Sequence, residues 1–310
     1  MNTIAITGGT GFVGRHLARR HAAAGDRVRI LTRRDTAAVP PDFHGSGVEF
    51  IRGDLENIPD AFFGEVDVLY HCAAELQDPK RMHAVHVGGT RALVGAAKGR
   101  VGRWVQLSSV GVYGRRADGE VTEATPPAPV GPYEVTKAEA DAIVRESMIP
   151  AVILRPSIIF GDDMPNASLR QLVSMIDRGW FVYVGRPGAS ANYVHIENVV
   201  DALMLCARHP RAVGDVFNLS AHLTVERFVA TIAEALGKRP PRLRVPAALL
   251  RAAVPLARLV PGAPLTHSRI DALTTRATYP STKITQTLGY HHRVSTEDGL
   301  RTFVATFRQR

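Results

Sequence analysis

The start of the chain joins a short apolar run to a glycine-rich turn and then to a helical pattern, and this feature constrains the fold most. Residues 3–7 read TIAIT, residues 7–14 read TGGTGFVG, and a helix is predicted from Val13 to Ala24. Without a Cβ, glycines let backbone amides approach a pyrophosphate and let the helix lie close to the strand. The helix N-terminus offers unpaired N–H groups and a positive dipole end to the phosphates. A turn of this kind binds a dinucleotide through its pyrophosphate. The candidate contacts here are Gly8, Thr10, Gly11, Phe12, Val13 and Gly14.

Strand and helix patterns continue to alternate through the first half of the chain. Further strands are predicted at 27–32, 48–51, 66–72, 104–108 and 151–155, with helices at 85–97 and 133–146. Strands spaced by helices of this length imply crossover connections and a parallel, doubly wound sheet. The predicted fold class is α/β, a Rossmann sheet followed by a smaller, mostly helical C-terminal substrate domain.

The pattern is less regular beyond about Gly161. Helices are predicted at 169–178, 196–209 and 225–236, the last capped by Thr224, and a strand at 216–219. We assign residues 1–161 to the dinucleotide-binding domain and residues 162–310 to the substrate-binding domain. Some segments of the second half are expected to return to the first domain.

The cysteines and histidines argue against a disulfide framework and against a metal site. Cys72 and Cys206 lie far apart in no CxxC or Cys/His pattern, which fits a reducing cytoplasm. No signal peptide is predicted, because the chain enters an apolar strand without a basic region or a long apolar run. We therefore expect a cytoplasmic protein. No metal is expected at the histidines, which lack credible ligand spacing: His71, His83, His86, His195, His291 and His292.

The net charge of +9 raises the question of a nucleic-acid partner. The arginines are spread along the chain, and no basic run is interleaved with aromatic residues as a single-strand platform needs. We therefore expect no nucleic-acid partner and interpret the charge as a solvated surface. Attraction of phosphate-bearing ligands or of an acidic membrane surface stays open.

The end of the second predicted strand bears on cofactor choice. An NAD-selective site usually places an Asp or Glu here to accept the ribose hydroxyls. This chain instead reads Leu31-Thr32-Arg33-Arg34. A guanidinium can bind a 2′-phosphate with charge-assisted hydrogen bonds and stack on adenine. Arg33 therefore favours NADP over NAD, the alternative being that both arginines are ordinary exposed loop residues.

Two further segments carry candidate catalytic residues. Residues 108–114 read SSVGVYG after the fifth predicted strand, and residues 133–137 read YEVTK. Tyr133 and Lys137 are four residues apart, so on a helix they share a face. A nearby ammonium stabilises a phenolate and is expected to lower the tyrosine pKa from about 10. Lys137 can also hold the nicotinamide ribose, and the Ser109 hydroxyl can hydrogen-bond the substrate oxygen.

With these motifs the chain resembles the extended short-chain dehydrogenases/reductases, also called the NAD-dependent epimerase/dehydratase family. The resemblance rests on TGGTGFVG (7–14), GDL (53–55), HCAA (71–74), SSVGVYG (108–114), YEVTK (133–137), LRPSIIFG (154–161) and YVHIENVVDAL (193–203). It implies a catalytic triad of Ser109, Tyr133 and Lys137 and a substrate pocket between the two domains. It also implies cofactor contacts at Asp54, Leu55, Ala73, Ala74, Pro156 and Ser157.

Departures from the family patterns narrow the expected function. Where the 4,6-dehydratases of the family carry an Asp-Glu pair, this chain has Val110 and Gly111, which disfavours dehydration. Where many nucleotide-sugar epimerases carry a diphosphate-binding arginine, it has Ala191. Thr32-Arg33 and residues 191–202 resemble the dihydroflavonol-reductase-like and 3β-hydroxysteroid-dehydrogenase-like branches.

We therefore predict hydride transfer at a secondary alcohol or ketone carbon of a small organic substrate. A nucleotide-sugar 4-epimerase is the alternative, because that chemistry uses the same triad. A non-catalytic dinucleotide sensor or assembly subunit is less favoured, because all three triad residues are present. Asn166 and Tyr193 are further candidates for the pocket, Tyr113 is interpreted as a packing residue, and a homodimer stays open.

Residues 244–265, RVPAALLRAAVPLARLVPGAPL, combine arginines with apolar residues. Arg244, Arg251 and Arg258 recur every seven residues, so on one helix they would lie on one side. The charges and Pro255 interrupt the apolar run well short of a membrane span. Three interpretations stay open: a helix packed on the substrate domain, a mobile cover over the pocket, and a peripheral contact with an anionic membrane.

Overall fold

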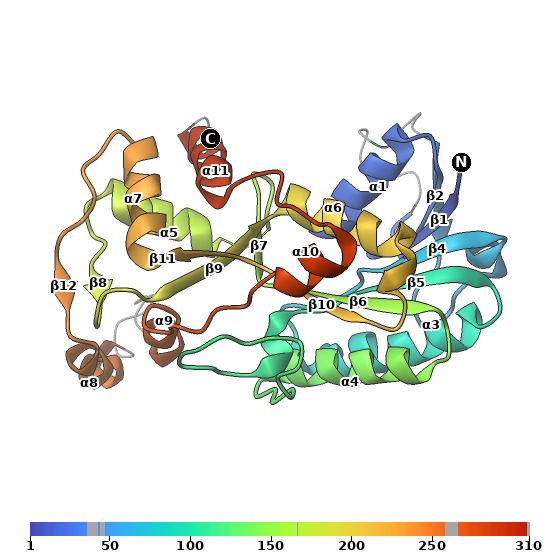
Figure 1. Ribbon diagram of the computed structural model, residues 1–310, viewed down its shortest axis with the longest axis horizontal. Coiled ribbons are helices and arrows are strands. Elements are labelled where there is room, and N and C mark those ends of the chain that lie inside the picture. The colour runs from blue at the N-terminus through green and yellow to red at the C-terminus, as the bar shows by residue number, and fades with distance from the viewer. Residues whose placement is uncertain (36–42, 44–46, 166, 258–265, 309–310) are drawn as a thin grey trace.

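The fold is built around a seven-stranded parallel sheet with the strand order β10-β6-β5-β4-β1-β2-β3 (Figure 1). The computed structural model describes residues 1–35, 43, 47–165, 167–257 and 266–308. The strands are β1 (Thr3–Thr7), β2 (Arg27–Thr32), β3 (Val48–Arg52), β4 (Val66–His71), β5 (Val101–Leu107), β6 (Ala151–Pro156) and β10 (Val216–Leu219). The order reverses beside β1, and ligands of such sheets bind there, at the carboxyl ends of the strands. The predicted α/β Rossmann class is confirmed.

Both faces of the sheet are buried, which explains the nearly continuous apolar strands of the sequence. In β1, Ile4 and Ile6 point into one core and Ala5 into the other. The first core lies under α1 (Phe12–Ala23), α6 (Ile196–Arg208) and α10 (Thr282–Leu288), and the second under α3 (Gly89–Ala97) and α4 (Pro132–Glu146). Figure 1 shows these two helical layers on opposite sides of the sheet.

The helix predicted at 85–97 is divided in the structure. A short helix α2 (Pro79–His83) starts after Asp78, whose side chain accepts a hydrogen bond from the Lys80 amide. A π-helical segment (Ala84–Gly88) follows and continues into α3. Single π-helical turns of this kind occur frequently at functional sites.

The second half of the chain forms a smaller, mostly helical lobe and also contributes to the central sheet. Its core lies among α5 (Ser168–Asp177), α7 (Val225–Ala235) and α11 (Thr296–Arg308), and Thr224 caps α7 as predicted. A three-stranded sheet, which the sequence did not predict, comprises β11 (Ala221–Thr224), β9 (Ser190–His195) and β7 (Ile158–Phe160). The returning elements are β10, which pairs with β6, and the helices α6 and α10.

The segment 244–265 differs from the single helix that its arginine spacing predicts. Arg244 lies in β12 (Arg244–Val245), which pairs with β8 (Tyr183–Val184), and α8 (Ala247–Ala257) begins only afterwards. The Arg244 guanidinium pairs with Glu226, and that of Arg251 pairs with Asp271 in α9 (His267–Ala272). The three arginines therefore do not form one helical stripe, and Arg258 falls outside the described residues.

The described part of α8 packs against β8 and α9. Val254 is buried with Val184 and Ile270, and Ala247 and Leu250 lie against this cluster. This contact agrees with the interpretation as a packed helix. Contact with a membrane stays a prediction from the sequence pattern alone. Among the described residues, no helix is long and apolar enough to cross a membrane.

Candidate active site

A cavity of about 1020 Å³ opens at the carboxyl ends of β1, β2, β4, β5 and β6. Segments that are far apart in the sequence meet in it, as expected beside the point where the strand order reverses. Every residue that the sequence predicts to bind the cofactor or to catalyse lines this cavity: Gly8, Thr10, Gly11, Phe12, Val13, Gly14, Arg33, Asp54, Leu55, Ala73, Ala74, Ser109, Tyr133, Lys137, Pro156 and Ser157.

The glycine loop has no room for a side chain at Gly8 or at Gly14. Gly8 adopts a φ of +69°, and a Cβ there would lie 2.6 Å from the amide nitrogen of Ala73. A Cβ on Gly14 would overlap the Gly8 carbonyl oxygen and lie 2.8 Å from the Cα of Gly9. The N-cap residue of α1, Gly11, supplies no side-chain hydrogen bond. The first amides of α1 are therefore available to a ligand, which fits a pyrophosphate at the helix N-terminus.

The end of the cavity beside β2 is cationic. Arg33 and Arg34 follow β2, are exposed, and form no ion pair with any described residue. Asp35 comes next in the chain but does not line the cavity. On the neighbouring loop, Asp54 accepts hydrogen bonds from the amides of Glu56 and Asn57 at 2.9 and 2.7 Å. These bonds fix the loop after β3 beside the cavity.

The triad residues come from the end of β5 and from the first turns of α4. Ser109 caps a 3-10 turn (Val110–Tyr113), and its Oγ accepts a hydrogen bond from the Gly111 amide at 3.0 Å. The Ser109 hydroxyl proton therefore remains available for a ligand oxygen. Tyr133 follows Pro132, the first residue of α4, and Lys137 lies one turn later. The Lys137 ammonium donates to the Leu107 carbonyl at 2.6 Å.

The pKa of Tyr133 differs from the prediction. Burial raises the pKa of Tyr133 to about 12, and the carboxylates of Glu134 and Asp141 add to the rise. The lowering expected from Lys137 is absent, because desolvation of the phenolate dominates. Burial also lowers the pKa of Lys137 from its ordinary value.

A buried histidine, which the sequence analysis discounted, connects the triad helix to the cavity wall. His86 Nε2 accepts a hydrogen bond from the Glu75 amide at 2.9 Å, so the proton of the neutral ring is assigned to Nδ1. Nδ1 then donates to Thr136 Oγ1 at 2.8 Å, and the ring lies edge-on to Tyr133 with centroids 5.5 Å apart. Burial lowers the pKa of His86 to about 4, so the ring is neutral at pH 7. His86 thereby fixes the start of α4 relative to the segment 73–75.

Beyond the glycine loop and the arginines, much of the cavity wall is apolar. Leu76 and Ile158 are among the exposed large apolar residues of the chain, with 63% and 50% of their surface accessible. Arg81 also lines the cavity and places a positive charge beside this apolar surface. The loop 162–165 is held against α1, because Asp163 pairs with both Arg15 and His16. The apolar part of the wall comprises Leu76, Val85, Ile158, Ile159, Met164 and Pro165.

Tyr193 and Asn166 are the two other residues that the sequence suggests for the pocket. Tyr193 is not among the cavity residues and packs on Phe228, with ring centroids 4.6 Å apart. Asn166 lies outside the described residues. Tyr113 is buried, as its interpretation as a packing residue predicts, and its hydroxyl donates to Asn218 at 2.9 Å.

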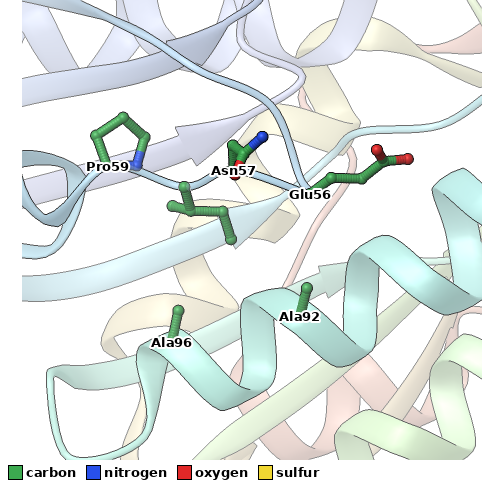
Figure 2. Close-up of a pocket in the computed structure, with 6 residues that line it drawn as sticks. Glu56, Asn57, Pro59, Ala92 and Ala96 are labelled. Carbon is green, nitrogen blue, oxygen red and sulfur yellow. The ribbon is translucent and has the colours of Figure 1, made fainter.

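A second pocket of about 470 Å³ lies between α3 and the loop after β3. Figure 2 shows Ala92 and Ala96 of α3 facing the segment that carries Glu56, Asn57 and Pro59. Glu56 borders both pockets, but this one contains no member of the triad. In the described parts of the chain, no group of three or more His, Cys, Asp or Glu side chains is placed to hold a metal ion.

Comparisons with known proteins agree with this geometry. The model of the NAD-dependent epimerase/dehydratase family matches residues 4–220. The chain belongs to this family. It is an enzyme of the family, an oxidoreductase or an epimerase, and the family matches the resemblance inferred from the motifs.

Two curated relatives and one solved structure show what the chain is similar to. The chain is 31% identical to the 4-hydroxy-2-methyl-3-oxo-4-farnesyl-3,4-dihydroquinoline-1-oxide ketoreductase of Stigmatella aurantiaca, over 95% of this chain and 93% of the relative. It is 32% identical to the sterol demethylase protein B of Methylococcus capsulatus, over 80% and 79% of the two chains. The UDP-glucuronic acid 4-epimerase of Bacillus cereus, solved with NAD, shares the fold with a TM-score of 0.77 and 20% identity over 99% of each chain.

Proposed function

We propose that this enzyme reduces a ketone, or oxidises the corresponding secondary alcohol, with a nicotinamide cofactor. The observation that carries the proposal is that Ser109, Tyr133 and Lys137 line the same cavity as the glycine loop. The bound cofactor would supply or accept the hydride. The hydroxyl of Tyr133 transfers the proton at the substrate oxygen, and Ser109 donates a hydrogen bond to the same oxygen. The Lys137 ammonium binds the nicotinamide ribose.

NADP is the cofactor we propose, as the end of β2 favours. The exposed guanidinium of Arg33 has no carboxylate partner among the described residues, so a 2′-phosphate can take that place. The Arg33 guanidinium would not repel NAD, which lacks the 2′-phosphate. We therefore propose that the enzyme prefers NADP, not that it is unable to bind NAD. The remaining cofactor contacts proposed are those of the glycine loop, Asp54, Leu55, Ala73, Ala74, Pro156 and Ser157.

The substrate we propose is apolar around its reacting carbon. Leu76 and Ile158 expose large apolar surfaces at the cavity, and covering such surface contributes roughly 25 cal/mol per Å². The names of the two curated relatives, with a farnesyl-bearing ring system and a sterol, support this class. Ala191 is buried at the position where many epimerases of the family carry a diphosphate-binding arginine. Val110 and Gly111 likewise provide no acid or base for dehydration.

A nucleotide-sugar 4-epimerase is the second candidate. The fold shared with the UDP-glucuronic acid 4-epimerase supports it, and the same three residues can move the proton in that reaction. The two functions differ in their requirement for cofactor turnover. A reductase consumes NADPH in proportion to product, whereas a 4-epimerase returns its cofactor to the starting state.

The test is to offer the purified protein two substrate sets, ketones with NADPH and UDP-sugars with the oxidised cofactor, NAD or NADP, because epimerisation at C4 begins with removal of a hydride. One set contains cyclic ketones that carry prenyl or sterol bodies, and the other contains UDP-glucose and UDP-glucuronic acid. We expect stoichiometric NADPH loss and alcohol formation with the apolar ketones. Inversion of either UDP-sugar at C4 without net cofactor consumption would replace the proposal with the epimerase.

A further inference from the structure

A buried ion pair lies one helical turn beyond the triad lysine. Asp141 follows Lys137 by four residues on α4, so both side chains lie on the same face as Tyr133. The Nε and Nη2 atoms of Arg155 donate to Asp141 Oδ2 at 3.1 and 3.0 Å. The side chains of this pair are only 5% and 2% exposed. Desolvating two charges in this way costs free energy that their attraction does not always recover. The position of the pair beside the predicted triad therefore suggests a role other than stability.

The end of β5 forms hydrogen bonds to the side chains of Lys137 and Asp141 on α4. The Leu107 carbonyl accepts a hydrogen bond from Lys137, and the next residue, Ser108, donates its hydroxyl to Asp141 Oδ2 at 2.8 Å. Ser109 is the residue that follows. Three consecutive residues therefore position the lysine, position its acidic neighbour and provide the triad hydroxyl.

The second carboxylate oxygen of Asp141 has no hydrogen-bond partner. Oδ1 is buried and accepts no hydrogen bond from any residue in the described part of the chain. Buried polar atoms are normally paired. An unpaired carboxylate oxygen in a desolvated site exerts a strong electrostatic effect on a charge one helical turn away.

The other titratable groups around Lys137 are neutral near pH 7. Burial lowers the pKa of His71 to about 3 and that of His86 to about 4, and it raises the pKa of the Cys72 thiol to about 12. Arg155 faces Asp141 from β6. Asp141 is thus the carboxylate that offsets the desolvation of the Lys137 ammonium, which on its own lowers the pKa of Lys137.

We propose that Asp141 is a positioning residue that keeps Lys137 protonated in its buried site, and that Arg155 and Ser108 hold Asp141 in place for this role. Its consequence for turnover rests on the proposed function. Without the carboxylate, Lys137 would lose its proton at a lower pH, and the ammonium that holds the ribose would be lost with it. Tyr133 would respond in the same direction, because Asp141 also raises the pKa of the Tyr133 phenol.

The experiment follows the titration of Lys137 directly in the protein without substrate. The chain contains only five lysines, Lys80, Lys98, Lys137, Lys238 and Lys283, so NMR of protein labelled at the lysine Cε gives a small set of signals. Comparison with Lys137→Arg assigns the relevant signal. In Asp141→Asn the Lys137 midpoint should move to lower pH by about one to three units, the range typical of losing a neighbouring opposite charge.

Glu139→Gln is the matched control, since it removes a carboxylate from the exposed side of the same helix and should leave the Lys137 midpoint unchanged. Asp141→Asn leaves the Arg155 guanidinium buried without a counter-charge and is prone to unfold. The double variant Asp141→Asn/Arg155→Gln removes both charges, and it should also titrate at lower pH than the wild type.

An unchanged Lys137 midpoint in a folded Asp141→Asn or double variant would overturn the proposal. Because the titration needs no reaction, it decides this point even if the enzyme turns out to be an epimerase. With an active substrate, the pH profile of kcat in the variant should move toward acid, whereas a purely structural role would lower stability and leave the profile in place.

Discussion

Gly14→Ala tests the link between the glycine loop, the packing of α1 and cofactor binding. The added Cβ would overlap the Gly8 carbonyl oxygen and lie 2.8 Å from both the Gly8 carbonyl carbon and the Gly9 Cα. All three atoms belong to the backbone, so the clash cannot be relieved by a rotamer change. Overpacking of this kind typically costs about 1–3 kcal/mol, from which the helix preference of alanine recovers about 0.5–1 kcal/mol. We expect a net loss of stability and a displacement of the α1 N-terminus.

The assay combines thermal unfolding with calorimetric titration of NADP. A displaced helix N-terminus should weaken cofactor binding at least about tenfold, which corresponds to about 1.4 kcal/mol. Gly95→Ala is the matched control. Gly95 lies in α3, and a Cβ added there would have no neighbour within 4 Å, so alanine should stabilise by about 0.5–1 kcal/mol and leave affinity unchanged. Wild-type stability and affinity in Gly14→Ala would refute the assigned role of the loop.

Two further predictions concern cofactor choice and pH. In calorimetry the wild type should bind NADPH more tightly than NADH, and Arg33→Asp should lose this preference, because it replaces attraction of the 2′-phosphate with repulsion; equal wild-type affinities would contradict the assignment of NADP. Burial lowers the pKa of His71 to about 3 and of His86 to about 4, whereas both titrate near 6.5 in an unfolded chain. The unfolded state therefore binds more protons below pH about 6.5, so the stability present above that pH should fall as the pH drops toward 4. Thermal melts between about pH 6.5 and pH 4 test this loss of stability. A melting temperature that does not change with pH would contradict the burial of both histidines in the neutral form.

Local patterns in the sequence were sufficient to predict the central sheet. In β1, Ile4 and Ile6 face one core and Ala5 faces the other, so the middle of the strand is an unbroken apolar run. The short strands β7 and β8 show no alternation of apolar and polar residues that could be recognised, because two or three residues are too few to distinguish a strand from a loop. The helix α11 was overlooked although Leu300, Phe303 and Val304 repeat at helical spacing. In 244–265, a seven-residue arginine spacing was mistaken for a helical stripe, because pairing of β12 with β8 decides the conformation of Arg244.

The candidate site was predictable where motifs are local and unpredictable where tertiary contacts decide. The glycine loop and the three residues of the predicted triad could be named from the sequence, because each lies in a short segment with characteristic spacing. The structure places them at one cavity. The roles of His86 and Arg155 depend on partners about 14 to 50 residues away, to which no local pattern points. Asp141 did have a signal, its spacing of four residues from Lys137. The direction of the Tyr133 pKa was mispredicted because burial is a property of the folded chain.

Proton transfer by Tyr133 is the central claim, and the rate of a Tyr133→Phe variant tests it most directly. The variant keeps the ring and its edge-on contact with His86 but lacks the hydroxyl. With an apolar ketone that the wild type reduces, single-turnover oxidation of NADPH should slow by roughly 10²–10⁴-fold, the range of general acid–base catalysis. Calorimetry should show nearly unchanged NADPH affinity. A Tyr133→Phe enzyme that turns over at the wild-type rate would contradict the account.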